Sequence, residues 1–340
     1  MHTININLFN EVNDDQKIFE YHLTNKNGIQ VSFIEYGATI TSIKIPVSND
    51  KKVDVVLGFD NIDDYINSFG LPNAPYFGAI IGQYSGRIKN ASFILNNEKI
   101  DLNANSGENH IHGGIHSFSQ KYWHLEKFDE VENAITLSLT TDENQENYPG
   151  SLKVSVKYQL TEDDKLIVYY KAISTKETII NLTQHSYFNL DGHEKDVLDQ
   201  DLKIYAEKYL ETDQQNIPTG KFIDVKNTNF DFTDYKKCPE NVDNTFVLNE
   251  GNDAAVSLIS QQNKLQMNVY TNQPAVHVYV GGNCFNQIKG KENANYHTKS
   301  GICFETQNFP DAPNHANFPS AILKKGESYN QKTIFEFKKI

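Results

Sequence analysis

The feature that most limits how this chain can fold is an alternation of apolar and polar residues with a period of two. Between positions 152 and 160, Leu, Val and Tyr occupy every even position, and Lys, Ser and Gln occupy the odd ones. Similar alternation recurs over 135–139, 265–269 and 276–280. Successive side chains of a β-strand point to opposite faces of a sheet, so each stretch is predicted to be a half-buried strand.

Short strands of this kind predict an all-β fold. Asn96 and Asn97 tolerate the positive φ of a two-residue turn, so 92–100 is predicted to be a hairpin. Helical stretches are scarce, and 60–68, capped by Asp60, is the best candidate. A chain of 340 residues could hold two domains, but no linker, repeat or low-complexity tract divides it. We therefore predict a large antiparallel β-sandwich with few short helices, forming a single domain over 1–340.

Charge and composition exclude several classes of partner. Lys and Arg number 31 against 44 Asp and Glu, which gives a net charge of −13. Such an acidic chain is a poor binder of nucleic acid or of an anionic membrane. No run of 18 apolar residues and no secretory signal is visible. The cysteines, Cys238, Cys284 and Cys303, show no CxxC spacing. We expect a cytoplasmic protein without disulfides.

Four polar stretches interrupt the alternating pattern, at 82–88, 107–116, 181–192 and 301–314. No GxGxxG, GK[ST] or GxSxG motif occurs, so neither a nucleotide loop nor a serine-hydrolase elbow is predicted. Taken one at a time, these residues have ordinary structural interpretations. Arg87 would be a surface or ion-paired arginine, His185 would be a core histidine, and Asp243 would form an Asx turn. Glu305 follows an apolar run and should be buried. An unpaired buried carboxylate is costly, so Glu305 needs a partner or a function.

The second stretch holds a His-x-His pair. On a strand His110 and His112 would project from one face, a spacing that metals use. A cupin-type site would also need a glutamate a few residues later, and the next one is Glu126. Two interpretations stay open: a metal site that includes His116, or histidines that hydrogen-bond beside a glycine turn. The missing glutamate favours the second.

Taken together, five short stretches resemble the aldose 1-epimerase (galactose mutarotase) family in their order and spacing. They are SGRI at 85–88, NHIHGG at 109–114, TQHSYFNL at 183–190, VDNTF at 242–246 and FETQNFPDA at 304–312. Weaker similarity at 36–40, 147–150 and 271–274 extends the resemblance over nearly the whole chain.

The resemblance implies the mutarotase-type sandwich and an isomerase that interconverts the α and β anomers of free hexoses, with D-galactose or D-glucose as substrate. It implies Glu305 as general base on the C1 hydroxyl and His185 as general acid on the ring oxygen. No cofactor and no metal are expected, and relatives are monomers or homodimers. The implied sugar-binding residues are Gly86, Arg87, His112, Ser186, Tyr187, Asp243 and His277.

Two positions depart from the family pattern. Asn244 stands where many relatives carry His, and His277 stands where some carry a Gln that touches sugar. The role of His277 is therefore open, and the support of Asp243 could differ from that in relatives.

Anomer exchange explains why these residue types are needed. The sugar ring opens when a base removes the C1 hydroxyl proton while an acid protonates the ring oxygen, and positioned groups of this kind each contribute about 10²–10⁴-fold. The two groups can come from distant points in the sequence, as His185 and Glu305 do. No hydride, electron or hydrolytic water takes part, so the reaction itself needs no cofactor.

Alternative functions remain. A hexose-6-phosphate 1-epimerase on the same fold should gather several Lys or Arg around the phosphate, whereas the five stretches offer only Arg87. A non-catalytic sugar-binding module would need no acid–base pair. A glycosidase would use Asp243 and Glu305 as its two carboxylates.

Overall fold

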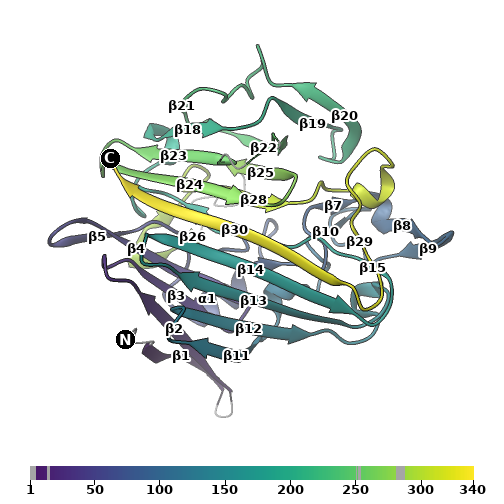
Figure 1. Cartoon of the computed structure of the whole chain (residues 1–340), viewed down its shortest axis with the longest axis horizontal. Coiled ribbons are helices and arrows are strands. Elements are labelled where there is room, and N and C mark those ends of the chain that lie inside the picture. The colour runs from purple at the N-terminus through teal and green to yellow at the C-terminus, as the bar shows by residue number, and fades with distance from the viewer. Residues whose placement is uncertain (1–4, 14–15, 250, 252–253, 281–287) are drawn as a thin grey trace.

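The structure, a computed structural model, describes residues 5–13, 16–249, 251, 254–280 and 288–340. Within these residues the chain is mostly β-strand, and the paired strands run antiparallel, as the alternating pattern predicted (Figure 1). The part of the chain described contains one α-helix, α1 (Ile62–Ser68).

The largest sheet crosses the whole molecule, with β30 near its middle (Figure 1). Among the described residues it has nine strands, in the order β11 (His124–Asp129), β12 (Ala134–Thr140), β13 (Leu152–Leu160), β14 (Lys165–Ser174), β30 (Ser328–Lys339), β24 (Leu265–Thr271), β23 (Val256–Ser260), β18 (Asp201–Ile204) and β21 (Lys236–Lys237). The alternation of buried and accessible residues along β13 matches the sequence prediction.

Two further sheets accompany it. As far as the structure describes them, the N-terminal sheet has the order β1 (Asn5–Asn13), β2 (Gln16–Thr24), β3 (Gln30–Ile34), β4 (Thr39–Ser48) and β5 (Lys51–Asp54). The other sheet has the order β17 (Tyr187–Phe188), β28 (Ile302–Gln307), β25 (Ala275–Val280), β22 (Val242–Val247), β19 (Lys208–Thr212) and β20 (Pro218–Asp224).

Short strand pairs complete the fold. They are β6 (Ile80–Ile81) with β16 (Thr183–Gln184), β7 (Arg87–Ile88) with β10 (His110–Ile111), β8 (Ser92–Leu95) with β9 (Glu98–Asp101), β15 (Thr178–Ile179) with β29 (Ile322–Leu323), and β26 (Ile288–Lys289) with β27 (Asn295–Tyr296). The predicted hairpin at 92–100 is confirmed as β8 and β9, and Asn96 and Asn97 both have positive φ.

One cluster of buried side chains draws on all three large sheets. Phe33 of β3 stacks on Tyr158 of β13, with ring centroids 4.4 Å apart. Phe188 of β17 contacts Phe335 of β30, with centroids 5.0 Å apart. The nine-stranded sheet therefore packs against both of the others, and burial of the whole apolar cluster between the sheets favours folding.

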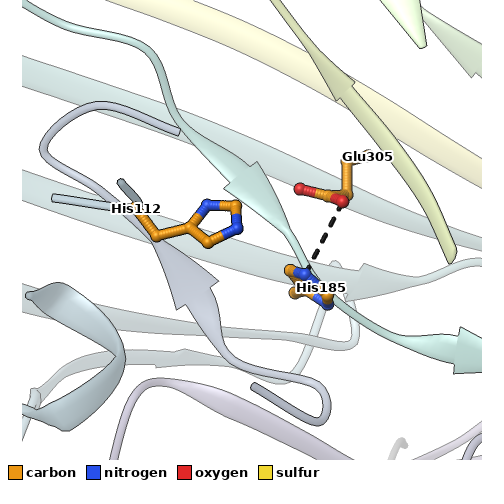
Figure 2. A group of neighbouring side chains, drawn as sticks. All are labelled: His112, His185 and Glu305. Atoms are coloured by element: carbon orange, nitrogen blue, oxygen red, sulfur yellow. Dashed lines mark ion pairs between the residues drawn. The ribbon is translucent and has the colours of Figure 1, made fainter. Parts of the chain in front are cut away.

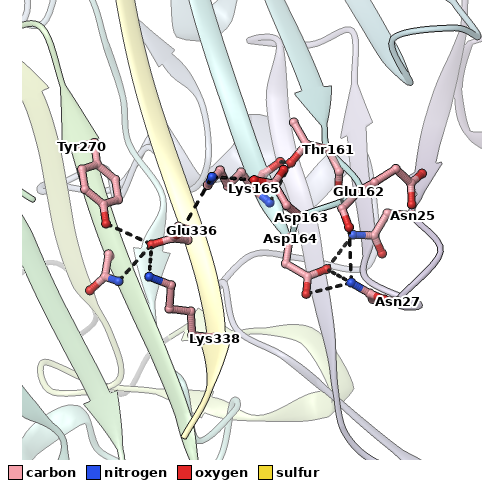
Figure 3. A network of polar contacts seen from close by, with 11 residues as sticks. Asn25, Asn27, Thr161, Glu162, Asp163, Asp164, Lys165, Tyr270, Glu336 and Lys338 are labelled. Carbon is pink, nitrogen blue, oxygen red and sulfur yellow. Dashed lines mark hydrogen bonds and ion pairs between the residues drawn. The ribbon is translucent and has the colours of Figure 1, made fainter.

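A polar network ties the N-terminal sheet to the nine-stranded sheet at the turn that follows β2 (Figure 3). Asn25 Nδ2 and Asn27 Nδ2 donate to Asp164 Oδ1, at 2.7 and 3.0 Å, and Asp164 lies in the turn before β14. Further along, Glu336 of β30 accepts a hydrogen bond from Tyr270 Oη at 3.0 Å. The hydrogen bonds to Asp164 join the two sheets at one end of the molecule, and the bond to Glu336 joins β24 to β30 within the nine-stranded sheet.

Three smaller expectations can be compared with the structure. The helix begins later than predicted, because Asn61, not Asp60, caps it: Asn61 Oδ1 accepts from Asp64 N at 2.9 Å. Cys238 is a buried free thiol, and Cys284 lies outside the described residues. In the part of the chain that the structure describes, no helix is long and apolar enough to cross a membrane.

Candidate active site

Three adjacent strands, β22, β25 and β28, present polar side chains on one face. Thr245 pairs with His277, and His277 pairs with Glu305, so these three side chains stand in a row across the sheet. Because side chains alternate along a strand, Asp243 and Tyr279 lie on the same face. The opposite face carries core residues, which are Phe246, Val276, Val278 and Phe304.

His185 lies between β16 and β17, and its side chain faces Glu305 of β28 (Figure 2). Its Nε2 is 3.6 Å from Glu305 Oε1, and each side chain is less than 5% exposed. That separation is longer than a hydrogen bond, so each group keeps capacity for a substrate oxygen. The ring is held by Cys303, whose Sγ lies 3.6 Å from Nδ1, and by Tyr187, whose ring centroid is 5.3 Å away.

Arg87 and His112 come from the β7–β10 pair, where Arg87 is opposite Ile111. His112 follows β10 with φ +52°, and Gly113 comes next with φ +83°. A Cβ on Gly113 would lie 1.9 Å from Gly82 O, so only glycine fits this turn. The turn directs the imidazole of His112 toward His185 and Glu305 (Figure 2).

These side chains line a cavity of about 370 Å³. Apart from the residues already described, its wall is mostly neutral and polar. The lining residues are Pro72, Asn73, Ala74, Tyr76, Gly86, Arg87, Asn105, Ser106, Ile111, His112, His185, Thr212, Asn216, Pro218, Asp243, Thr245, His277, Tyr279, Glu305, Gln307 and Pro310. A concave site with a few convergent polar groups is the usual form of a small-molecule site.

Asp243 and His277 form a close pair at one side of the cavity. His277 Nε2 lies 2.9 Å from Asp243 Oδ1, and Asn216 Nδ2 donates to Asp243 Oδ2 at 2.9 Å. Burial alone would raise the pKa of Asp243, but the hydrogen bond and charge of His277, with Arg87 nearby, lower it below its ordinary value. Asp243 is therefore an ionised acceptor at neutral pH.

His112 is a neutral donor. Burial, reinforced by the neighbouring His185 and Arg87, holds the pKa of His112 well below the usual range for histidine. Its Nδ1 accepts a hydrogen bond from Gly86 N at 3.3 Å. The proton of the neutral ring therefore lies on Nε2, which can donate to a sugar oxygen.

The cluster also has to be considered as a metal site, because ligand atoms of His112, His185 and Glu305 all lie within 4.8 Å of one another. A metal ligand must offer a lone pair, and the bond from Gly86 N uses the lone pair on His112 Nδ1 and leaves Nε2 protonated. The donor set therefore suits hydrogen bonding to a polar substrate better than metal binding.

The structure brings together most of the residues singled out from the sequence: Gly86, Arg87, His112, His185, Asp243, His277 and Glu305 all line the cavity. Ser186 and Tyr187 were expected to line it too, and the described lining includes neither. Ser186 Oγ accepts from Gln184 Nε2 at 2.6 Å inside the protein. Tyr187 packs behind His185 and against Phe77. Tyr187 therefore supports the His185 ring from the side away from the cavity.

The expectation that His110 and His112 share a face is wrong. The positive φ of His112 ends the strand after Ile111. His110 is buried elsewhere, with Nδ1 2.7 Å from Asn103 O and Nε2 2.7 Å from Tyr148 Oη. Of the two open interpretations, hydrogen-bonding histidines beside a glycine turn is the one that the geometry fits.

The two departures from the family pattern have different consequences. Asn244 lies on the opposite face of β22 from Asp243 and is nearly buried, so it does not reach the cavity. His277 lines the cavity, but both of its ring nitrogens have protein partners, Asp243 and Thr245.

Sequence reasoning missed several lining residues. Thr245, Tyr279 and Gln307 follow from the period of two, because each lies two positions from a residue already singled out. Tyr76 and Asn216 lie in loops, and no local pattern in the sequence indicates that those loops reach the site.

The sandwich places a buried histidine–glutamate pair in the wall of a polar cavity, which is the usual form of a site for a small polar molecule. Comparison with known proteins shows the family to which the chain belongs. The family model described as Aldose 1-epimerase matches residues 20–336. Galactose mutarotase from Bos taurus is 35% identical, with 91% of each chain covered. Aldose 1-epimerase from Haemophilus influenzae is 36% identical, covering 93% of this chain and 94% of the relative.

A solved structure agrees with these relatives. The crystal structure of galactose 1-epimerase from Lactobacillus acidophilus superposes with a TM-score of 0.86 at 27% identity, covering 99% of both chains. The chain belongs to the aldose 1-epimerase family, whose members are carbohydrate epimerases, a class of isomerase.

Proposed function

We propose that this enzyme interconverts the α and β anomers of free hexoses, with D-galactose or D-glucose as substrate. The observation that carries the proposal is the buried pair His185–Glu305, whose facing atoms lie 3.6 Å apart in the wall of the cavity. The hydroxyl and ring oxygens of a hemiacetal are bonded to the same carbon, so two groups at this separation can address both at once.

In the proposed reaction Glu305 removes the proton from the C1 hydroxyl. The electron pair of the broken O–H bond forms the second bond of the C1 carbonyl. The bond from C1 to the ring oxygen breaks with its electron pair on the ring oxygen, which takes a proton from His185. Rotation about C1–C2 exposes the other carbonyl face. Closure then reverses both proton transfers, so acid and base return to their starting states without a net change in protons.

Arg87, His112 and Asp243 are proposed to hold the sugar. Arg87 offers several donors, the Nε2 proton of His112 supplies another, and the Asp243 carboxylate accepts from hydroxyls. Because these donors and acceptors are fixed before the sugar arrives, they favour one orientation of the ring and reduce the entropy cost of positioning it. Gly86 lets this segment pack closely against Pro310, which also lines the cavity, since a Cβ at Gly86 would lie 2.9 Å from the Pro310 side chain.

The cavity favours a neutral sugar over a phosphorylated one. Among the described residues that line it, Arg87 is the only lysine or arginine. A dianionic phosphate is normally held by several such side chains or by a helix N-terminus. We assign Asp243 to sugar binding and not to glycosidase chemistry, because both of its carboxylate oxygens already have protein partners in His277 and Asn216.

The test is optical rotation of freshly dissolved α-D-galactose, α-D-glucose and glucose 6-phosphate, each with and without protein. We expect acceleration with at least one free hexose that exceeds the acceleration with the phosphate. A faster reaction with glucose 6-phosphate would assign the enzyme to the phosphorylated substrate. Binding of sugar without any acceleration would indicate a non-catalytic module. The cytoplasmic location stays a prediction that fractionation of cells can check.

A further inference from the structure

His277 occupies the centre of the polar face, yet neither of its ring nitrogens is available to a sugar. Nε2 lies 2.9 Å from Asp243 Oδ1, and Nδ1 lies 2.9 Å from Thr245 Oγ1. Thr245 itself lines the cavity, beside His277 in the strand register. The histidine therefore acts on its two neighbours, which face the cavity.

Counting protons in this group of three shows what the histidine controls. An ionised carboxylate can only accept, so Nε2 keeps its proton and donates to Asp243. When the ring is charged, Nδ1 also donates, and it donates to the oxygen of Thr245. The hydroxyl proton of Thr245 is then free to point into the cavity.

When the ring loses a proton, it loses the one on Nδ1, because Asp243 holds the other. Nδ1 then has a lone pair, and the hydroxyl of Thr245 turns to donate to it. The contact between the two residues survives, but the cavity loses a donor and a nearby positive charge.

We propose that His277 is a positioning residue whose proton determines whether Thr245 donates to the sugar, so that sugar affinity falls as His277 becomes neutral. This inference rests on the proposed function for its kinetic test and deepens it, since it makes substrate binding dependent on pH through a residue that need not touch the substrate.

The charges around His277 favour its protonated form. Burial disfavours its charged form, but the hydrogen bond to Asp243 on β22 and the charges of Glu305 on β28 and of Asp243 outweigh burial, and the pKa of His277 is raised above its ordinary value. Arg87 on β7 opposes this shift. His277 therefore keeps its proton to a higher pH than an ordinary histidine and loses it as the pH rises.

Two other histidines share the cavity and must be separated from His277. The pKa of His112 lies well below the usual range, so His112 stays neutral throughout the range of interest. His185 is the proposed acid, so its contribution is expected in kcat. For this reason the test follows KM and compares variants at each pH.

The experiment measures KM for the hexose that the parent protein turns over, between about pH 6 and pH 9, the range around the usual histidine pKa. We expect the KM of the parent to rise about two- to tenfold with pH, the range for loss of one hydrogen bond. In His277→Gln the rise should disappear, because an amide can donate to Asp243 and accept from Thr245 but does not titrate.

Three further variants sharpen the result. Thr245→Val removes the hydroxyl and should also abolish the rise, while Thr245→Ser retains the hydroxyl and should preserve it. His124→Gln, at an exposed position on β11, should keep the profile of the parent. A rise that persists in His277→Gln or Thr245→Val, or a flat profile in the parent, would overturn the inference.

A spectroscopic readout separates failure of this inference from failure of the proposed function. Nitrogen chemical shifts of the His277 ring, assigned by comparison with His277→Gln, report which nitrogen loses its proton. We expect Nε2 to stay protonated while Nδ1 titrates. Loss of the Nε2 proton would overturn the inference whether or not the protein accelerates anomer exchange.

Discussion

Removing the ammonium group of Lys291 is expected to destabilise the fold much more than removing an exposed lysine. Lys291 Nζ donates to Asp54 Oδ2 at 2.8 Å and to Thr41 O at 2.6 Å. The side chains of Lys291 and Asp54 are only 8% and 5% exposed. In Lys291→Met the apolar stem is retained, while a buried carboxylate and a buried carbonyl each lose a partner.

The size of the effect follows from the burial of this pair. Breaking a buried ion pair by removing one partner costs about 3–5 kcal/mol. Unfolding entropy near the midpoint is about 2.1 cal/mol/K per residue, or about 0.7 kcal/mol/K for 340 residues. The melting temperature of Lys291→Met should therefore fall by about 4–7 °C.

Thermal unfolding followed by circular dichroism at neutral pH measures this change. Lys299→Met is the matched control, because Lys299 Nζ lies 2.9 Å from Glu240 Oε2 in a pair whose carboxylate is 76% exposed. An exposed pair contributes about 0–1 kcal/mol, so the control should melt within about 2 °C of the parent. If Lys291→Met also melts within that range, the reasoning about the buried pair is refuted.

The pH dependence of this difference gives a second check. Burial would raise the pKa of Asp54, but the charge of Lys291 and hydrogen bonds from His193 and Lys291 hold it well below the usual range. Because the pKa of Asp54 is lower in the folded state, its ionised carboxylate stabilises the fold at pH values above the ordinary aspartate pKa of about 3.9. This stabilisation is lost as the pH falls below that value. The difference in melting temperature between the parent and Lys291→Met should therefore become smaller below about pH 4.

Three further outcomes are expected. Gly113→Ala should raise KM and lower the free energy of unfolding by about 1–3 kcal/mol, because the new Cβ would lie 1.9 Å from Gly82 O and displace His112. A variant that matches the parent in KM and melting temperature would contradict this. Asn216→Ala should raise KM about two- to tenfold and affect kcat less, since Asp243 loses the 2.9 Å hydrogen bond from Asn216; an effect confined to kcat would count against it. Because one core cluster draws on all three large sheets, we propose that the chain unfolds as a single domain, and two resolved calorimetric transitions would disprove that.

The parts of the site that the sequence predicted are those governed by local periodicity or by a family motif. The alternation along 276–280 placed His277 on the face opposite Val276 and Val278, which pack in the core. The apolar run before Glu305 indicated burial, and the structure provides the nearby group that burial required. Only the resemblance to a family connected this glutamate to His185, which lies 120 positions earlier.

The parts that the sequence could not predict depend on long-range packing. Asn216 reaches Asp243 because the loop after β19 folds over the six-stranded sheet, and no local signal encodes that contact. The expectation that His110 and His112 share a face failed for a local reason. The turn that contains Gly113 already begins at His112, where φ is positive, so the alternation of side chains along the strand ends before His112. Ser186 and Tyr187 follow His185 in sequence, but both side chains are buried in the protein and do not line the cavity.

The most direct test of the proposed mechanism is the rate at which fresh α-D-galactose reaches its equilibrium rotation with the parent, Glu305→Gln and His185→Asn. Each substitution removes one positioned acid or base and should slow the catalysed rate by about 10²–10⁴-fold. The double variant should be little slower than the worse single variant, because the two groups act as a unit. Relaxation by either single variant at the rate of the parent would contradict the assignment of His185 and Glu305 as acid and base.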